Sequence, residues 1–382
     1  MASARGAGSE WSGSGLDKAL RAGISQLRQR YLWTSPHTGP APPPSPTHPL
    51  PLHSLPVEVQ LHILSLLSPR DLCQLGSVNG YWNAVVRDPL LWRYFLQRDL
   101  PLWKSVDYLS LPDTALLSKS LTQNAEQDYM AAYLRSCPES RKQWKSSHPV
   151  YSSVTSFLYS LVSQAEPRLA MFGPGLEQLD TSLVTKMMNS PSLLPLAGLP
   201  QRQIDGIGSG ISFFFNREHK FNILTLYSTT WKERECARME ESAAINKLFV
   251  PQGVADVDGA DGDPPRLGAS YSVIPQVEQV CRLVDGFIYV ANAEARRKHD
   301  RKEECLQIQA MINRALGPAG RPLLVLSCVS QPDMNRVPCV HLSHHLQLSL
   351  LDVPWLTQDS DAETLAGFLE GIEWILRELG RL

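Results

Sequence analysis

The sequence has no long hydrophobic run, no paired cysteines and no excess of one charge. No apolar stretch approaches the roughly 18 residues that would span a bilayer. Thirty-six basic and 38 acidic residues give a net charge of −2, so no overall positive field attracts nucleic acid. The seven cysteines include no C-x-x-C pair, which indicates reduced thiols rather than a zinc site or a disulfide framework. The N-terminus lacks the apolar segment of a signal peptide, so we expect a protein of the cytosol or nucleus.

Residues 1–54 predict a disordered, proline-rich N-terminal region. Apolar residues recur at helical spacing from Leu16 to Tyr31, so 16–33 predicts an amphipathic helix. That helix either lies on the rest of the protein or pairs with a second copy to form a homodimer. Nine of the 29 prolines fall between Pro36 and Pro56, which favours a stiff polyproline tether.

The apolar pattern of residues 55–100 predicts four short and strongly apolar helices. The run Ser68-Pro69-Arg70-Asp71 indicates a helix start, with serine as N-cap, proline at the first helical position and an acid two residues later. Gly76 is expected to end this helix in the left-handed conformation. A third helix is predicted from Ser77 to Val85, and Asp88-Pro89 opens the fourth. So small and apolar a unit indicates an obligate partner.

This pattern of leucine, proline and tryptophan resembles the F-box, a helical motif. A generic helical bundle is the alternative. The resemblance implies binding to the Skp adaptor of a cullin-RING ubiquitin ligase. The adaptor-binding residues that it implies are Leu55, Pro56, Ile63, Leu64, Leu67, Leu72, Val78, Trp82, Leu91 and Trp92.

The rest of the chain divides into a helical linker, residues 101–150, and an α/β domain with a mostly parallel sheet, residues 151–382. The linker carries the aromatic residues Trp103, Tyr129, Tyr133 and Trp144. The predicted strands are 168–172, 211–215, 221–227, 286–291 and 323–329. The predicted helices are 151–164, 181–188, 231–249, 294–316 and 361–379. The aspartate-rich stretch 251–269 predicts a disordered surface insertion.

In segments 284–292, 321–327, 355–358 and 366–376 the α/β domain resembles an Arf-like small GTPase, but the nucleotide-binding motifs are missing. A phosphate loop counted from Gly175 places Asp180, Thr181 and Ser182 where glycine, lysine and a hydroxyl residue are needed. Residues 328–331 offer no carboxylate to read guanine, and 228–231 contain no D-x-x-G. We therefore predict no nucleotide cofactor and no catalysis, only a pseudo-GTPase scaffold that binds protein.

Other candidate chemistry is weak. Gly206, Gly208 and Gly210 precede a strand, the wrong order for a dinucleotide turn. His344 and His345 are neighbours, and adjacent residues of a strand point to opposite faces, so no metal site is expected. Three cysteines are expected to be packed thiols: Cys281, Cys305 and Cys328.

The resemblance implies the substrate-recognition subunit of a Skp–cullin–F-box ubiquitin ligase, and runs 199–210 and 284–295 match one member of the F-box family closely. It implies telomeric-repeat-binding factor and D-type cyclins as substrates, and self-association before the F-box. It also implies regulation by phosphorylation in that region. The candidate serines are Ser12 and Ser14, which no proline follows, and Ser35 and Ser45, which precede prolines. A regulatory GTPase and a scaffold that acts outside a ligase remain the alternatives.

The substrate surface is expected at 337–350, which predicts an open edge strand, with an interior strand as the alternative. Substrate would add a strand there. The residues concerned are Val340, His341, Leu342, His344 and Leu346.

Overall fold

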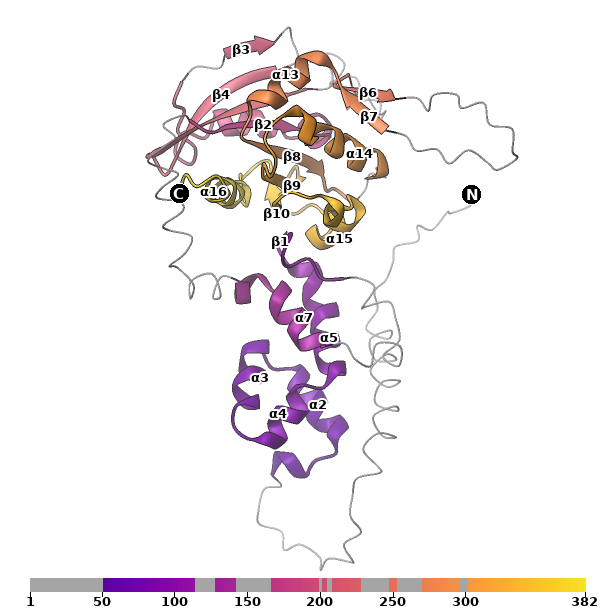
Figure 1. The fold of residues 1–382 in the computed structure, drawn as a ribbon. Coiled ribbons are helices and arrows are strands. Elements are labelled where there is room, and N and C mark those ends of the chain that lie inside the picture. Colours follow the sequence, from indigo (N-terminus) through magenta and orange to yellow (C-terminus); the bar gives the residue numbers. More distant parts are fainter. Residues whose placement is uncertain are drawn as a thin grey trace, which may run out of the picture. The chain divides into compact units, whose positions relative to one another are not determined.

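The computed structural model describes residues 51–113, 128–141, 166–198, 201–204, 208–227, 247–252, 270–295 and 301–382. The chain forms two compact units (Figure 1): unit 1 is Met1–Arg98 with Lys119–Ala131, and unit 2 is Asp99–Ser118 with Ala132–Leu382. The helices expected over 16–33 and 151–164 lie outside the described residues, as do Trp144, most of 231–249 and most of the aspartate-rich stretch.

Unit 1 contains the short helices that its sequence predicts. They are η1 (Leu52–Ser54), α2 (Val57–Ser65), α3 (Pro69–Gly76), α4 (Gly80–Val86) and α5 (Pro89–Asp99), which runs to the unit boundary. The centre of the unit is apolar, with Leu64, Leu72, Trp92 and Phe95 at most 1% exposed. The indole N–H of Trp92 donates to the backbone oxygen of Val86 at 2.6 Å, so its single polar atom is satisfied inside the core.

The helix ends confirm one prediction and correct two. α3 begins as predicted, because the Oγ of Ser68 accepts a hydrogen bond from the backbone N–H of Asp71 at 3.1 Å. Gly76 is not left-handed, since α3 passes into a right-handed Ser77. Ser77 does not start α4. Its hydroxyl donates to the backbone oxygen of Gln74 in α3 at 2.6 Å. Asn79 is the N-cap of α4 instead.

Unit 2 is built on an eight-stranded, mostly parallel sheet, as predicted. Its order is β1-β10-β9-β8-β2-β5-β4-β3, and the neighbours from β10 to β5 are parallel. β1, β4 and β3 pair antiparallel with their neighbours. The strands are β1 (Ser105–Asp107), β2 (Arg168–Phe172), β3 (Gln201–Ile204), β4 (Gly208–Phe215), β5 (His219–Leu226), β8 (Gly286–Asn292), β9 (Leu323–Val329) and β10 (Trp355–Asp361). A separate hairpin joins β6 (Phe249–Gln252) to β7 (Ser270–Val273).

Helices cover both faces of the central strands, and every residue of β8 and β9 is buried. Alternate residues such as Leu169 and Met171 share one core with α11 (Leu183–Met188) and α16 (Phe368–Glu378). On the other face, the hydroxyl of Tyr289 donates to Glu304 of α14 (Arg301–Met311). Further elements are η2 (Leu100–Leu102), α7 (Tyr129–Ser136), α10 (Gly175–Gln178), α13 (Pro275–Leu283), η3 (Arg314–Leu316), α15 (Cys339–His345) and η4 (Leu348–Leu350).

The expected helical linker is only partly helical. β1 lies within it and pairs with β10, with Val106 opposite Thr357, so the start of the linker belongs to the sheet of unit 2. Trp103 and Tyr133 are buried, and their rings meet edge to face at 5.9 Å, which packs α7 against this edge. Within the described part of the chain, every helix is too short or too polar to cross a bilayer.

Candidate functional site

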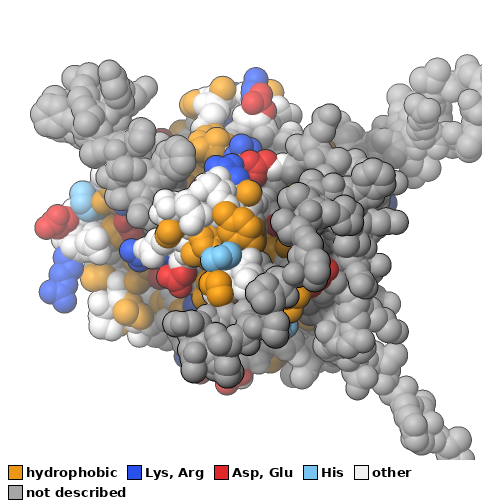
Figure 2. Space-filling view, turned by 90° about the horizontal axis from the view of Figure 1, so that it is seen from below, with side chains coloured by type: hydrophobic (Ala, Val, Ile, Leu, Met, Phe, Trp, Pro, Cys, Tyr) orange, Lys and Arg blue, Asp and Glu red, His pale blue; other side chains and the backbone are white. Residues whose placement is uncertain are grey.

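Unit 1 exposes apolar side chains on neighbouring helices. Five of them form what we call the apolar surface of unit 1: Leu52, Val59, Leu66, Val78 and Tyr81. Leu66 is 74% exposed and Val78 is 67% exposed, which is unusual for such residues in a folded motif. Figure 2 shows hydrophobic side chains gathered around a histidine on the face nearest the viewer. This surface can bind a partner through hydrophobic burial.

Two side chains hold the start of this surface together. The hydroxyl of Tyr81 in α4 donates to Gln60 of α2 at 2.7 Å, and the ring of Tyr81 meets His53 of η1 edge to face at 6.4 Å. Gln60 is buried and donates in turn to the backbone oxygen of Leu55 at 2.7 Å. These contacts fix η1, α2 and α4 relative to one another before any partner arrives.

The ten residues expected to bind the adaptor have two different roles. Four are interior, at most 3% exposed, and act as framework: Leu64, Leu72, Leu91 and Trp92. Pro56 and Val78 are exposed, while Leu55, Ile63, Leu67 and Trp82 are half-buried, so only these six can touch a partner directly.

Sequence reasoning did not select four of the residues in the apolar surface of unit 1: Leu52, Val59, Leu66 and Tyr81. The helical period carried some of the signal, because Val59, Ile63 and Leu66 follow one another at steps of four and three along α2 and its cap. That spacing defines a stripe, but it does not say which stripe faces the core.

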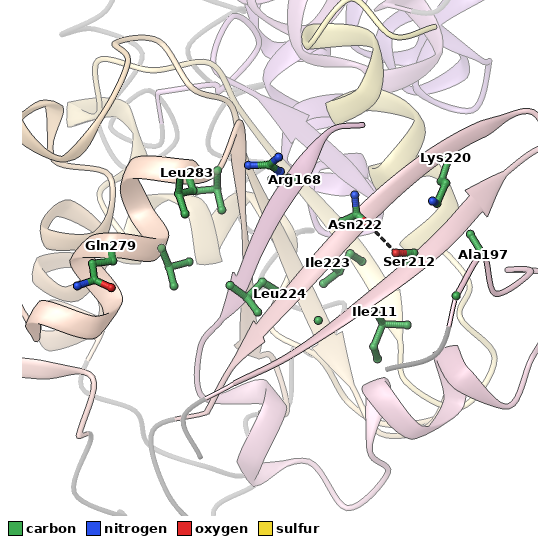
Figure 3. A pocket seen from close by; sticks show the side chains of 14 residues that line it. Arg168, Ala197, Ile211, Ser212, Lys220, Asn222, Ile223, Leu224, Gln279 and Leu283 are labelled. Carbon is green, nitrogen blue, oxygen red and sulfur yellow. Dashed lines mark hydrogen bonds between the residues drawn. The ribbon is translucent and has the colours of Figure 1, made fainter. Parts of the chain in front are cut away.

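Unit 2 carries a hollow of about 670 Å³ between α13 and strands β4 and β5 (Figure 3). Leu224 and Leu283 give it apolar walls, and Arg168, Lys220 and Asn222 supply polar groups. Lys220 forms an ion pair with Glu166 at 2.7 Å. Hydrogen bonds from Lys220 and from Asn222 lower the pKa of the Glu166 carboxyl. The hollow can therefore make both apolar and polar contacts with a side chain of another protein.

The place of a phosphate loop is closed. Gly173 follows β2 with φ of +121°, and a Cβ on it would lie 2.6 Å from the backbone oxygen of Val290. The loop therefore packs directly on β8, and the short helix α10 starts at Gly175. Ser182, which the count from Gly175 places at the hydroxyl position of a phosphate loop, instead caps α11, because its Oγ accepts from the N–H of Thr185.

Hydrogen bonds also join the loops at the edge of the sheet where a nucleotide would lie. Parallel α/β sheets bind ligands outside the carboxyl ends of their strands. Here Glu294, after β8, accepts from both the backbone N–H and the hydroxyl of Ser330, at 3.0 and 2.6 Å. The Oγ of Ser330 also accepts from the N–H of Asp180 at 3.0 Å. These bonds tie three loops to one another.

Asp359 and Asp361 of β10 share one cation. Arg336 pairs with Asp361 and lies 3.5 Å from Asp359. Burial raises the pKa of Asp359 to about 6, although Arg336 acts in the opposite direction. Burial of the Asp359 carboxyl therefore outweighs the attraction of Arg336.

The prediction of an open edge strand at 337–350 is wrong. Residues 339–345 form helix α15, and Val340, Leu342 and Leu346 are fully buried. Pro338 is the N-cap of this helix, and the buried residues Cys339, Leu342 and Leu346 follow one another at helical steps of three and four. His341 is half-buried, and the Nε2 of His344 contacts the backbone oxygen of Pro112 at 2.8 Å. Strand addition at these five residues is therefore excluded.

The expectation of packed thiols is confirmed for Cys281, Cys305 and Cys328, which are all buried. Burial raises the pKa of Cys281 and that of Cys328 to about 12, so neither forms a thiolate at neutral pH. Among the described residues, no group of three or more His, Cys, Asp or Glu side chains is placed to hold a metal ion.

Comparison with known proteins identifies the class first. A sequence model of the family described as F-box-like matches residues 52–98, the stretch from η1 nearly to the end of α5. The protein is an F-box protein, and such proteins are generally substrate adaptors rather than catalysts.

The chain is 60% identical to F-box only protein 4 of Homo sapiens over 331 residues, which are 86% of this chain and 84% of the relative. It is 57% identical to F-box only protein 4 of Mus musculus over the same shares. The chain belongs to the F-box only protein 4 family, as the runs 199–210 and 284–295 indicated.

Unit 2 has a mostly parallel sheet with helices on both faces, the fold class that its sequence predicts. A solved structure of the Arl6 BBS3 small GTPase from Trypanosoma brucei with bound nucleotide analogue GppNp matches with a TM-score of 0.34 and 14% identity. The match covers 57% of this chain and 99% of that one.

Proposed function

We propose that this protein is the substrate-recognition subunit of a Skp–cullin–F-box ubiquitin ligase and directs bound proteins to degradation. The observation that carries the proposal is the apolar surface of unit 1, displayed on a framework with a fully buried Trp92. Hydrophobic burial at about 25 cal/mol per Å² makes such a surface a strong adaptor contact. Adaptor binding then brings the cullin and RING subunits.

Substitution of an exposed leucine by aspartate tests the proposed adaptor contact. We expect Leu66→Asp in the full chain to weaken Skp adaptor binding at least 100-fold, because the contact would bury an unpaired carboxylate. Leu350→Asp is the matched control, since Leu350 is 68% exposed but lies in unit 2. Both variants should keep the wild-type thermal unfolding temperature. Equal adaptor affinity of wild type and Leu66→Asp, measured by calorimetry, would contradict the proposed contact.

Unit 2 is the proposed receptor for substrate. Telomeric-repeat-binding factor and D-type cyclins are the candidates that the family resemblance implies. β1 and β3 are the outer strands of the described sheet, so a strand from substrate would pair with one of them. β1 has three residues and β3 has four, and we favour β3 because it is the longer outer strand.

The remaining expectations belong to the same proposal. They are self-association through residues 16–33, phosphorylation in the N-terminal region, and residence in the cytoplasm and nucleus. Reconstituted ubiquitination separates the ligase from a ligase-independent scaffold. A scaffold would bind the Skp adaptor but would not support cullin-dependent transfer of ubiquitin to substrate.

A further inference from the structure

Ser68 is an exposed serine in the turn between α2 and α3, followed directly by Pro69. Its backbone is extended, with φ −75° and ψ 151°, as expected for a residue that precedes proline. A proline-directed kinase requires a serine of this kind, with its hydroxyl at the surface and proline next in the chain.

Ser190 provides a comparison within the same chain. It also precedes a proline, Pro191, but it is half-buried. Its backbone oxygen accepts from the N–H groups of Leu193 and Leu194, at 3.1 and 2.9 Å, so Ser190 is tied to the turn that follows it. Of the two Ser-Pro pairs in the described part of the chain, Ser68 is the accessible one.

We propose that Ser68 is a phosphorylation site for a proline-directed kinase and that its phosphorylation switches off adaptor binding. This inference rests on the adaptor contact proposed above. The kinase transfers the γ-phosphoryl group of ATP to the Oγ of Ser68. A bond forms between Oγ and the γ-phosphorus, the bond from that phosphorus to the β,γ-bridging oxygen breaks, and ADP leaves. The hydroxyl proton passes to the carboxylate base of the kinase.

The modification reverses a local interaction. In the unmodified protein the hydroxyl of Ser68 donates to Oδ2 of Asp71 at 2.7 Å. A phosphoester oxygen has no proton to donate, so this bond is lost. A group with a charge of about −1.5 to −2 then lies beside the Asp71 carboxylate. The exposed Arg70 supplies a single positive charge, so the turn changes from neutral to negative.

The same charge lies at the adaptor contact. Ser68 is two residues from Leu66, so their Cα atoms are at most about 7.6 Å apart. This is within the Debye length of about 8 Å at physiological ionic strength. An adaptor that covers Leu66 would have to remove water from the phosphate, which is unfavourable without a cationic partner. Adaptor binding and phosphorylation should therefore exclude each other.

The experiment uses the full chain with Ser35, Ser45 and Ser190 changed to alanine, so that Ser68 is the last Ser-Pro serine. The protein is treated with a purified cyclin-dependent or mitogen-activated kinase and ATP, and the product is mapped by mass spectrometry. Affinity for the purified Skp adaptor is then measured by calorimetry. We expect phosphate on Ser68 and at least a 10-fold loss of adaptor affinity.

The control variant is Ser68→Asn in the same background. Asparagine keeps a side-chain oxygen that can cap α3, but it has no hydroxyl to modify. We expect this variant to bind adaptor like the untreated protein before and after kinase treatment. Absence of phosphate from Ser68 overturns the site, and unchanged affinity after stoichiometric modification overturns the switch. Failure of the untreated protein to bind adaptor would instead refute the proposed function.

Discussion

Asp359 shows how one buried side chain sets the pH response of unit 2. Its carboxyl lies within β10 beside Asp361, and Arg336 is the cation that faces both. Because burial raises its pKa to about 6, the folded protein binds a proton at pH 5 that the unfolded chain, with an ordinary pKa of about 4, has largely released. The contribution of Asp359 to stability is present below pH 4 and is lost as the pH rises through 6.

We therefore expect Asp359→Asn to change the pH dependence of unfolding. The free energy of unfolding of the variant, minus that of wild type, should rise by about 2 kcal/mol between pH 4 and pH 7.5, since each pKa unit corresponds to about 1.4 kcal/mol and the unfolded carboxyl is already half titrated at pH 4. Urea denaturation at several pH values measures this difference, in which all other titrating groups cancel. A difference that stays constant with pH would mean that Arg336 keeps the Asp359 pKa at its ordinary value.

Helix α15 is the element whose prediction failed, and it gives a direct test of the structure. Leu342 faces the interior with no exposure, and the hydroxyl of Ser343 donates to Thr357 of β10 at 2.8 Å. An open edge strand would tolerate lysine along its length. A buried helix would tolerate lysine on its outer face alone.

We expect Leu342→Lys to lower the stability of unit 2 by about 4 kcal/mol or more, because it removes a packed leucine and buries a charge. The midpoint of thermal unfolding should fall by about 8–16 °C for a domain of this size. His345→Lys is the matched control, since His345 lies on the same helix but is exposed, and its midpoint should stay near that of wild type. Equal midpoints for the two variants would show that α15 is not packed on the sheet.

For the whole molecule, the central prediction is a GTPase-like unit that does not bind nucleotide. The loop after β2 packs on Val290, and Glu294 brings a carboxylate to the edge where phosphates would lie. Thr181 stands where a lysine would neutralise the phosphates. We expect calorimetric titration with GTP or GDP at millimolar concentration, with Mg²⁺, to show no binding. Micromolar affinity would overturn this and favour the regulatory GTPase.

Much of the fold could be predicted because its signals are local. The strand Leu323–Val329 consists of leucine and valine apart from Ser327 and Cys328, and its bounds were predicted without error. The start of α3 was equally clear, because Ser68, Pro69 and Asp71 each favour that position for a separate physical reason.

The sequence by itself determined the helical motif, the mostly parallel sheet and the loss of nucleotide motifs, because these depend on residue type and spacing along the chain. The tertiary structure alone decided that 339–345 is a buried helix, that β1 joins the sheet, and that Leu66 faces outward while Leu64 faces the core. Apolar periodicity predicts which side chains are apolar along one face of an element, but it does not predict which other element that face packs against. That choice depends on contacts between residues far apart in the chain, which no local pattern contains.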